Sequence, residues 1–188
     1  MTLIVSVMII VIISFINPSA KERVFDQTLS QINLINKNKN NNDKIYIFSE
    51  QHNSHYVTAY KMFLDNKILG VGVKNFRNFC NHEKYSQNEL SCSTHPHNTY
   101  IQLLSETGIV GFLFLMFTLF YFCKYLLKHL LAKLKGRNYY TDFEICILSG
   151  VAIFLWPFIP TGNIFNNWLN IITILSIPFL IWSKNQKI

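Results

Sequence analysis

Charged residues are scarce in this sequence. Asp, Glu, Lys and Arg together make up 14% of its 188 residues, whereas half of the residues are hydrophobic. A typical soluble domain has about 25% charged residues, so the composition excludes an ordinary soluble domain. Acidic residues are the scarcer sign, at 10 against 17 basic residues, and the formal net charge is +7. No internal repeat is found along the chain.

The hydrophobic residues are gathered into four runs that carry almost no charge, over residues 1–16, 109–123, 145–160 and 168–182. A helix that crosses a bilayer needs about 20 mostly apolar residues. Flanking residues extend the second and fourth runs to that length. We therefore predict an all-α integral membrane protein with about four transmembrane helices, with three as the alternative.

The predicted order begins with a transmembrane helix over residues 1–16 and a long, partly helical loop domain over 17–99. The remaining segments are a transmembrane helix over 100–123, a cytoplasmic loop over 124–144, and transmembrane helices over 145–161 and 164–183. The first run also has features of a secretory signal peptide, because "FINPSA" ends in small residues. No basic residue precedes that run, as a signal peptide would require, so we favour a membrane span.

Lysine and arginine are unevenly placed along the chain. They cluster in the segment 124–137 and in the tail 184–188. Short loops rich in Lys and Arg normally face the cytoplasm, so the long loop is expected on the outside of the membrane. Since this asymmetry accounts for most of the net charge, the charge does not indicate a nucleic-acid partner.

The long loop holds Cys80 and Cys92. An oxidising outer compartment favours a disulfide between them, which would stabilise the fold by roughly 3 kcal/mol on the chain-entropy estimate. Two free thiols are the alternative. A zinc-binding loop is a further alternative class, because zinc accepts Cys and His ligands; its candidate ligands are Cys80, His82, Cys92, His95 and His97.

The first half of the loop mixes helical patterns with a low-complexity stretch. The segment 22–35 has loosely helical spacing, and Asn36–Asp43 is expected to be a flexible tether. After the tether, Ser49 can cap a helix whose aromatic face lies on protein or on the membrane surface; that face comprises Tyr56, Tyr60, Phe63 and Leu64.

A glycine turn follows this predicted helix. Gly70 and Gly72 permit backbone geometry that other residues avoid and leave their N–H groups approachable. Arg77 follows closely, and its planar guanidinium suits phosphate oxygens. The turn is therefore a candidate diphosphate site, with a plain turn and a solvated arginine as the alternative.

The stretch "HPHNTYIQLLSETGIVG" joins the loop to the second apolar run. Asn98 can cap a helix that begins there, and Gln102, Ser105 and Glu106 follow it on one helical stripe. A carboxylate at the edge of a membrane normally faces a bundle interior or a water-filled cavity. Thr107 and Gly111 form a small-xxx-small pair, which favours close approach of another helix.

His97 lies where this polar stripe meets the predicted membrane surface. A neutral histidine at that boundary can take a proton from a hydroxyl, while Arg77 and backbone amides can bind a diphosphate leaving group. Together they suit glycosyl transfer from a lipid-linked diphosphate sugar. A histidine that only helps to start the helix is the alternative.

The stretch resembles the motif of the bacterial O-antigen ligase family, in which His is followed by Asn, Ser or Gln, nine residues, Gly, two residues, and Gly, Thr or Tyr. His97, Asn98, Gly108 and Gly111 fall on these positions. The order of an external helix, "GVGVKNFRNFC", "HPHN", a span, a basic loop and a last pair of spans also resembles the C-terminal half of that family.

The resemblance implies transfer of an undecaprenyl-diphosphate-linked glycan to an acceptor hydroxyl, lipid A–core in the ligases proper, at the outer face of the bacterial inner membrane. It implies inversion at the sugar and neither metal nor cofactor. His97 is then the general base, and Arg77 holds the diphosphate with Gly70 and Gly72. The orienting or structural positions are Asn98, Glu106, Gly108 and Gly111.

Two departures from the family are expected to matter. Family members usually have many more spans, so we expect this chain to be the C-terminal part of a larger enzyme whose N-terminal membrane bundle is missing, and its activity alone is left open. Many relatives carry an arginine at the start of the loop helix, where this chain has "EQHNSHY". His52 or His55 would be a weaker substitute.

Two other functions fit the same pattern. A polymerase that joins lipid-linked repeats to one another uses the same residue types as a ligase. A non-catalytic membrane subunit with four spans, whose external loop binds another protein, is the second possibility. It predicts that removal of the His97 imidazole has no effect, whereas changes on the face of Tyr56 and Phe63 do.

Overall fold

The computed structural model describes residues 2–22, 26 and 48–185. The regular elements in these ranges are helices, and no strand occurs among them, which confirms the all-helical prediction. The chain divides into two compact units, residues 1–53 and 54–188. The predicted tether Asn36–Asp43 and, apart from residues 22 and 26, the helical pattern at 22–35 lie outside the described residues.

The first unit contains α1 (Thr2–Ile16) and α2 (Pro18–Lys21). Asn17 caps α2, because its Oδ1 accepts a hydrogen bond from Ser19 N at 3.0 Å, and Pro18 occupies the first helical position, where its missing N–H costs nothing. The helix α4 (Glu50–Asp65) begins in this unit and continues into the second. Ser49 Oγ accepts from His52 N at 3.3 Å, so the predicted cap is confirmed.

The polar domain, defined here as residues 54–98, opens the second unit. It contains the rest of α4, the short helix α5 (Phe76–Phe79) and the 3-10 helix η2 (Glu89–Ser91). The buried residues of its small apolar core are Ala59, Met62, Phe76 and Cys80. The predicted disulfide between Cys80 and Cys92 is present, with 4.9 Å between the two Cα atoms.

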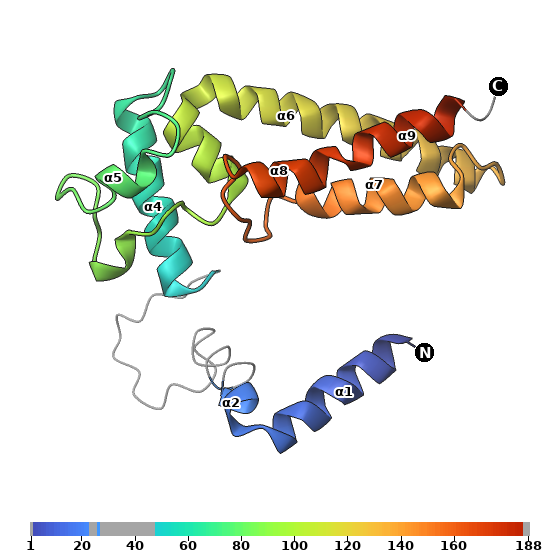
Figure 1. Ribbon diagram of the computed structural model, residues 1–188, viewed down its shortest axis with the longest axis horizontal. Coiled ribbons are helices and arrows are strands. Elements are labelled where there is room, and N and C mark those ends of the chain that lie inside the picture. The colour runs from blue at the N-terminus through green and yellow to red at the C-terminus, as the bar shows by residue number, and fades with distance from the viewer. Residues whose placement is uncertain (1, 23–25, 27–47, 186–188) are drawn as a thin grey trace. The chain divides into compact units, whose positions relative to one another are not determined.

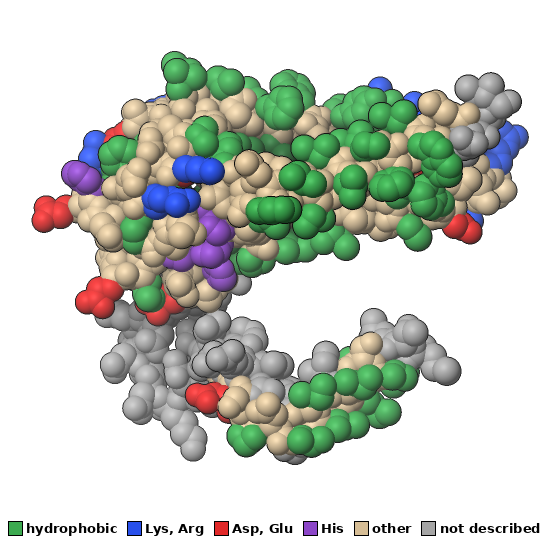
Figure 2. Space-filling model, in the orientation of Figure 1, with side chains coloured by type: hydrophobic (Ala, Val, Ile, Leu, Met, Phe, Trp, Pro, Cys, Tyr) green, Lys and Arg blue, Asp and Glu red, His purple; other side chains and the backbone are tan. Residues whose placement is uncertain are grey.

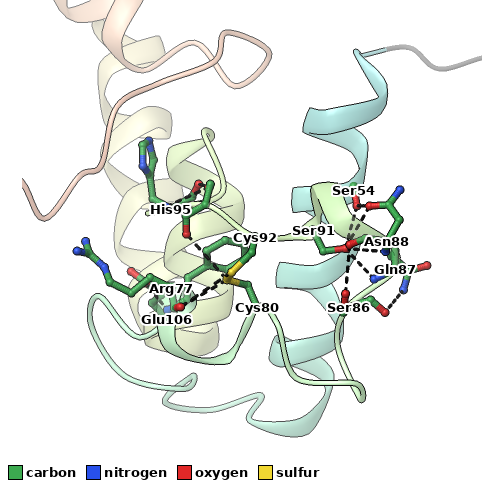
Figure 3. Close-up of a disulfide and its surroundings, with 12 residues drawn as sticks. Ser54, Arg77, Cys80, Ser86, Gln87, Asn88, Ser91, Cys92, His95 and Glu106 are labelled. Carbon is green, nitrogen blue, oxygen red and sulfur yellow. Dashed lines mark hydrogen bonds between the residues drawn. A yellow bond between two sulfur atoms is a disulfide. The ribbon is translucent and has the colours of Figure 1, made fainter.

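The buried stripe of α4 differs from the predicted aromatic one. The buried side chains of α4 are Ser54, His55, Thr58, Ala59 and Met62. Tyr60 is 49% exposed and Leu64 is 45% exposed, so these two residues do not face the domain core, and contact of their face with a membrane surface stays a prediction. Ser54 Oγ donates to Asn88 Oδ1 at 2.7 Å, so this face also holds the η2 segment against α4 (Figure 3).

The helix α6 (Thr99–Leu134) links the polar domain to the apolar part of the chain. Asn98 Oδ1 accepts from Tyr100 N at 3.0 Å and from Ile101 N at 3.1 Å, which confirms the predicted cap. The helix continues past the predicted end at Cys123 to Leu134, because Lys and Leu are good helix formers. It stops before Gly136, which has the left-handed φ of 69° that is common just after a helix.

Three further helices follow α6: α7 (Asp142–Phe154), α8 (Asn167–Ile174) and α9 (Ser176–Asn185); each of the three contacts the other two. In the second unit α6, α7 and α9 run side by side, and α8 leads into α9 (Figure 1). Leu115 of α6 and Leu155, just after α7, belong to one buried apolar cluster. The helix α7 ends earlier than predicted, because Pro157 follows it and cannot continue a helix.

One helix of the second unit has the length and composition of a membrane span. In the described ranges α6 is the one helix that is both long and apolar enough to cross a bilayer, so the predicted total of four spans is not confirmed. Phe114, Phe117 and Phe120 on α6 are each at least 70% exposed, and hydrophobic side chains extend along the outer surface of the bundle (Figure 2). Such a surface suits lipid rather than water.

Candidate functional site

The site is built around a break in α6. Gly108 has φ 66° and ψ −160°, which is not helical, and the loop 67–72 of the polar domain crosses the helix at this point. Val71 N donates to Ser105 O at 2.9 Å, and Ile109 N donates to Lys67 O at 2.8 Å. The loop therefore supplies both donors and acceptors for backbone groups that the broken helix leaves unpaired.

Two glycines make this crossing possible. A Cβ on Gly70 would lie 2.6 Å from Ser105 O, and a Cβ on Gly108 would lie 2.7 Å from Leu69 N. Both residues also have the left-handed φ that L side chains avoid, at 68° and 66°. The loop and α6 approach each other backbone to backbone, which explains why both positions are glycine.

The same contacts correct the interpretation of the glycine turn. Gly70 N donates to Asn66 O at 2.9 Å, and Gly72 N donates to Glu106 O at 3.0 Å. Neither amide is therefore open to a diphosphate in this structure. A Cβ on Gly111 would lie 2.7 Å from Thr107 Cβ, the other member of the small-xxx-small pair; close approach of another helix at this pair stays a prediction.

Glu106 fastens the polar domain to α6 from inside. Its carboxylate is 1% exposed. Its Oε1 accepts from Phe76 N at 2.9 Å, and its Oε2 accepts from Gln102 Nε2 at 2.9 Å. Because Phe76 is the first residue of α5, the carboxylate fixes the start of the helix that carries Arg77.

Gln102 extends this network to the turn before α8. Its Nε2 also donates to Asn163 Oδ1 at 2.9 Å, and its Oε1 accepts from Ile164 N at 3.2 Å. All the members of the predicted polar stripe are buried: Asn98, Gln102, Ser105 and Glu106. The prediction that this stripe faces a protein interior is confirmed.

Three histidines pack together beside this network. The ring of His97 lies 4.3 Å from the ring of His95 and 5.3 Å from the ring of His55, measured between centroids. His55 is fully buried on α4, whereas His97 is only half-buried. His55 therefore packs against the His97 ring inside the protein, and a bulky ligand cannot reach it.

The backbone of His97 has an uncommon conformation. Its φ is 59°, in the left-handed region, where histidine is more frequent than most residues but still strained, at a cost on the order of 1–3 kcal/mol. The carbonyl of His97 accepts from Thr161 N at 2.9 Å. The turn after α7 thus holds a strained residue in place, and such strain is found most often at functional sites.

His95 is held by the same turn. Its Nε2 lies 3.1 Å from the carbonyl oxygen of Thr161, so this nitrogen carries the proton and donates it. Burial lowers the pKa of His95 below the ordinary 6.5, and this outweighs the opposite effects of the Thr161 carbonyl and the Glu106 charge; the Arg77 charge lowers the pKa further. His95 therefore favours the neutral form.

This pKa shift predicts a pH-dependent stability. The folded state disfavours protonated His95, so below pH 6.5 the unfolded chain binds more protons than the folded chain, and the free energy of unfolding falls as the pH falls. We expect the unfolding temperature in detergent to drop between neutral pH and about pH 5. His95→Gln should reduce that drop, whereas His82→Gln, at an exposed histidine, should leave it unchanged. An equal drop in the His95 variant would contradict the assignment.

Arg77 lies at the edge of the same region. Its side chain is exposed, and its charge acts on His95. Arg77, Glu106 and His95 lie on one side of the disulfide, and the Ser54–Asn88–Ser91 cluster lies on the other (Figure 3). On the face shown in Figure 2, cationic side chains lie close to a group of histidine side chains. Arg77 is thus within electrostatic range of His95, whose ring packs against that of the half-buried His97.

The zinc alternative loses two of its candidate ligands. Cys80 and Cys92 are joined to each other, so neither offers a thiolate. In the described part of the chain, no group of three or more His, Cys, Asp or Glu side chains is arranged to hold a metal ion. His52, named above as a weaker substitute for the arginine of the relatives, belongs to the first unit, where its Nδ1 lies 2.8 Å from Ser49 Oγ.

A family model described as O-antigen ligase matches residues 1–116, which is more than half of the chain. This chain belongs to the O-antigen ligase family. The matched range includes Arg77, the disulfide, His97 and the helix break at Gly108. Members of the O-antigen ligase family act in a membrane on lipid-linked glycans and their acceptors. No curated protein and no solved structure matches the chain.

Several residues of the site lie outside what the motif indicates. Thr161 and Asn163, which hold His97 and Gln102, come after the range that matches the O-antigen ligase family. Lys74 has a left-handed φ of 60° and lies near Arg77 in the chain. The segment "TGNIFNNW", which holds Thr161 and Asn163, is rich in Asn and Gly. This composition indicates a turn, but it does not indicate that the turn contacts His97 and Gln102.

Proposed function

We propose that this protein transfers a glycan from an undecaprenyl-diphosphate carrier to an acceptor hydroxyl, as an O-antigen ligase does in lipopolysaccharide or surface-polysaccharide biosynthesis. One observation carries the proposal: His97, on the family motif, is half-buried, packed between two histidine rings and held by the Thr161 amide. A strained, half-buried histidine at the end of a membrane helix is suited to remove a proton from a bound hydroxyl.

In the proposed step, His97 takes the proton of the acceptor hydroxyl. The hydroxyl oxygen of the acceptor attacks the anomeric carbon of the donor sugar at the same time. The bond between that carbon and the diphosphate oxygen breaks, and the lipid diphosphate leaves with the electron pair. Arg77 stabilises the negative charge of the leaving group, since a guanidinium can donate two parallel hydrogen bonds to phosphate oxygens. Attack from the side opposite the leaving group inverts the anomeric centre, and the step needs no metal.

The proposed setting is the bacterial inner membrane, with the polar domain in the periplasm. Support comes from the apolar helix α6 and from the basic residues of the segment 124–137, which lie toward its far end from the polar domain. We further propose four spans, formed by α1, α6, α7 and the α8–α9 pair, and a role together with the N-terminal membrane bundle of a larger enzyme. Lipid A–core is the proposed acceptor.

The test compares membranes of the source organism with and without a disrupted gene for this protein. Disruption should cause long glycans to accumulate on undecaprenyl diphosphate and should remove the glycan from its acceptor. Restoring the wild-type gene should reverse both changes. The two products are separated by lipid extraction and gel electrophoresis, followed by mass spectrometry of the acceptor fraction.

The length of the accumulated glycan decides between related functions. Single repeat units on the carrier would indicate the polymerase, because chain growth would then be the lost step. Unchanged glycan in both fractions would contradict a role in transfer and would favour the non-catalytic subunit.

A further inference from the structure

An open cleft of about 280 Å³ includes Arg77 in its lining, and the proposed mechanism uses none of its other lining residues. One wall comes from the polar domain and the other from the turn before α8 together with the start of α8. The lining residues are Lys74, Arg77, Asn163, Asn166, Asn167 and Trp168. The second wall lies beyond the residues that the family model matches.

The two walls are held at a fixed separation from within. Glu106 binds the backbone of Phe76, next to Arg77, and Gln102 joins Glu106 to Asn163. Each of these hydrogen bonds is 2.9 Å long, and both Glu106 and Gln102 are at most 1% exposed. A cleft whose walls are connected through buried side chains is a preformed site, which lowers the entropic cost of binding.

The residue types on the second wall suit a sugar ring. The indole of Trp168 is 76% exposed, and an exposed aromatic face can cover the apolar C–H face of a pyranose. The amides of Asn166 and Asn167 can both donate and accept hydrogen bonds, as hydroxyl groups around a sugar require. Asn166 Oδ1 already accepts from Trp168 N at 3.1 Å, which fixes the start of α8 beside the ring.

The first wall suits an anion. Arg77 and Lys74 are both exposed and both face the cleft. Lys74 has a left-handed φ of 60°, although it is not glycine, so its position is maintained against backbone strain. The cleft therefore has a cationic wall opposite a wall of amides and an indole.

We propose that this cleft is a glycosyl-phosphate subsite, in which Lys74 joins Arg77 on the phosphate groups while Trp168 and Asn167 bind the first sugar of the donor. This assignment rests on the proposed function and names the donor contacts of the same site. Lys74 would then be a second cation for the diphosphate. Many relatives carry an arginine at the start of the loop helix instead, which is a different position in the chain.

Binding can be measured without transfer. The probe is a short-chain prenyl diphosphate N-acetylglucosamine, compared with inorganic diphosphate, and the protein is the full chain in detergent. In a chain with Trp156→Phe and Trp182→Phe, Trp168 is the remaining tryptophan, so its fluorescence should change on addition of the sugar probe. Titration calorimetry on the chain with all tryptophans gives the dissociation constant independently.

We expect Lys74→Met to weaken binding of both probes by about tenfold, as loss of a charged contact would. Asn167→Ala and Trp168→Ala should weaken binding of the sugar probe by about fivefold and leave inorganic diphosphate binding unchanged. Matched controls are Lys84→Met and Asn81→Ala, both at exposed positions that do not line the cleft.

Equal affinity of the sugar probe for wild type and for the Asn167 and Trp168 variants would overturn the sugar part of the proposal. Equal affinity of Lys74→Met and wild type would overturn the phosphate part. Because the binding experiment measures no transfer, it tests the subsite separately from the proposed function. If the variants bind as expected and gene disruption leaves glycan transfer intact, the subsite is supported and the proposed function is overturned. If disruption abolishes transfer and the variants bind like wild type, the subsite is overturned and the proposed function is supported.

Discussion

Replacing His97 with asparagine is expected to lower the rate of glycan transfer about 10²–10⁴-fold, the usual contribution of a general base. Asparagine is the informative substitution because His97 has a φ of 59°, and asparagine tolerates the left-handed conformation better than most residues. The variant therefore keeps the backbone that Thr161 holds and removes only the imidazole. Transfer is measured in membranes that contain the donor and the acceptor.

The expected result separates catalysis from folding. The carboxamide of the His97→Asn variant cannot accept the proton, so the rate at saturating donor should fall while the unfolding temperature stays near that of wild type. His82→Asn is the matched control, because His82 is an exposed histidine of the same domain. Retention of full activity by the His97 variant would end its assignment as the base, and an equal loss in the His82 variant would point to general damage.

Replacing Glu106 with leucine is expected to destabilise the second unit by about 3 kcal/mol, because a buried donor left unpaired costs about 1–3 kcal/mol. The carboxylate accepts from Phe76 N and from Gln102 Nε2. Leucine offers no acceptor, so Phe76 N loses its partner inside the protein, and Gln102 Nε2 keeps only its hydrogen bond to Asn163 Oδ1. The free energy of unfolding is measured by denaturant titration in detergent.

Glu106→Gln should have a smaller effect, since its amide oxygen can still accept one of the two hydrogen bonds. Glu83→Leu serves as the control, because Glu83 is exposed and its loss should change the stability little. A Glu106→Leu chain as stable as wild type would show that the network does not hold the polar domain on α6. In that case the fixed separation of the cleft walls would also lose its explanation.

The parts of the structure that sequence reasoning predicts are those set by neighbouring residues. Asn98 caps α6 and Ser49 caps α4, as their positions before helical patterns indicate. The disulfide follows from two cysteines 12 residues apart in the long loop that was expected to face an oxidising compartment. The buried polar stripe of α6 follows from helical periodicity, which places residues three and four apart on one face.

The contacts that complete the site join distant residues and leave no local signal. Gln102 and Asn163 are 61 residues apart, and nothing in either segment indicates the other. Gly108 lies within an apolar helical pattern, where a glycine usually indicates close helix packing rather than a break. The glycine turn gave a correct signal for unusual backbone geometry, but its N–H groups bind Asn66 and Glu106 carbonyls rather than a ligand.

The crossing of the loop 67–72 over α6 also couples the motion of the polar domain to that of α6. Hydrogen bonds run in both directions across this junction, from Val71 and Gly72 to α6 and from Ile109 back to Lys67. The polar domain and the end of α6 therefore behave as one stiff body. A displacement of Arg77 by a bound donor is therefore expected to move the end of α6 as well.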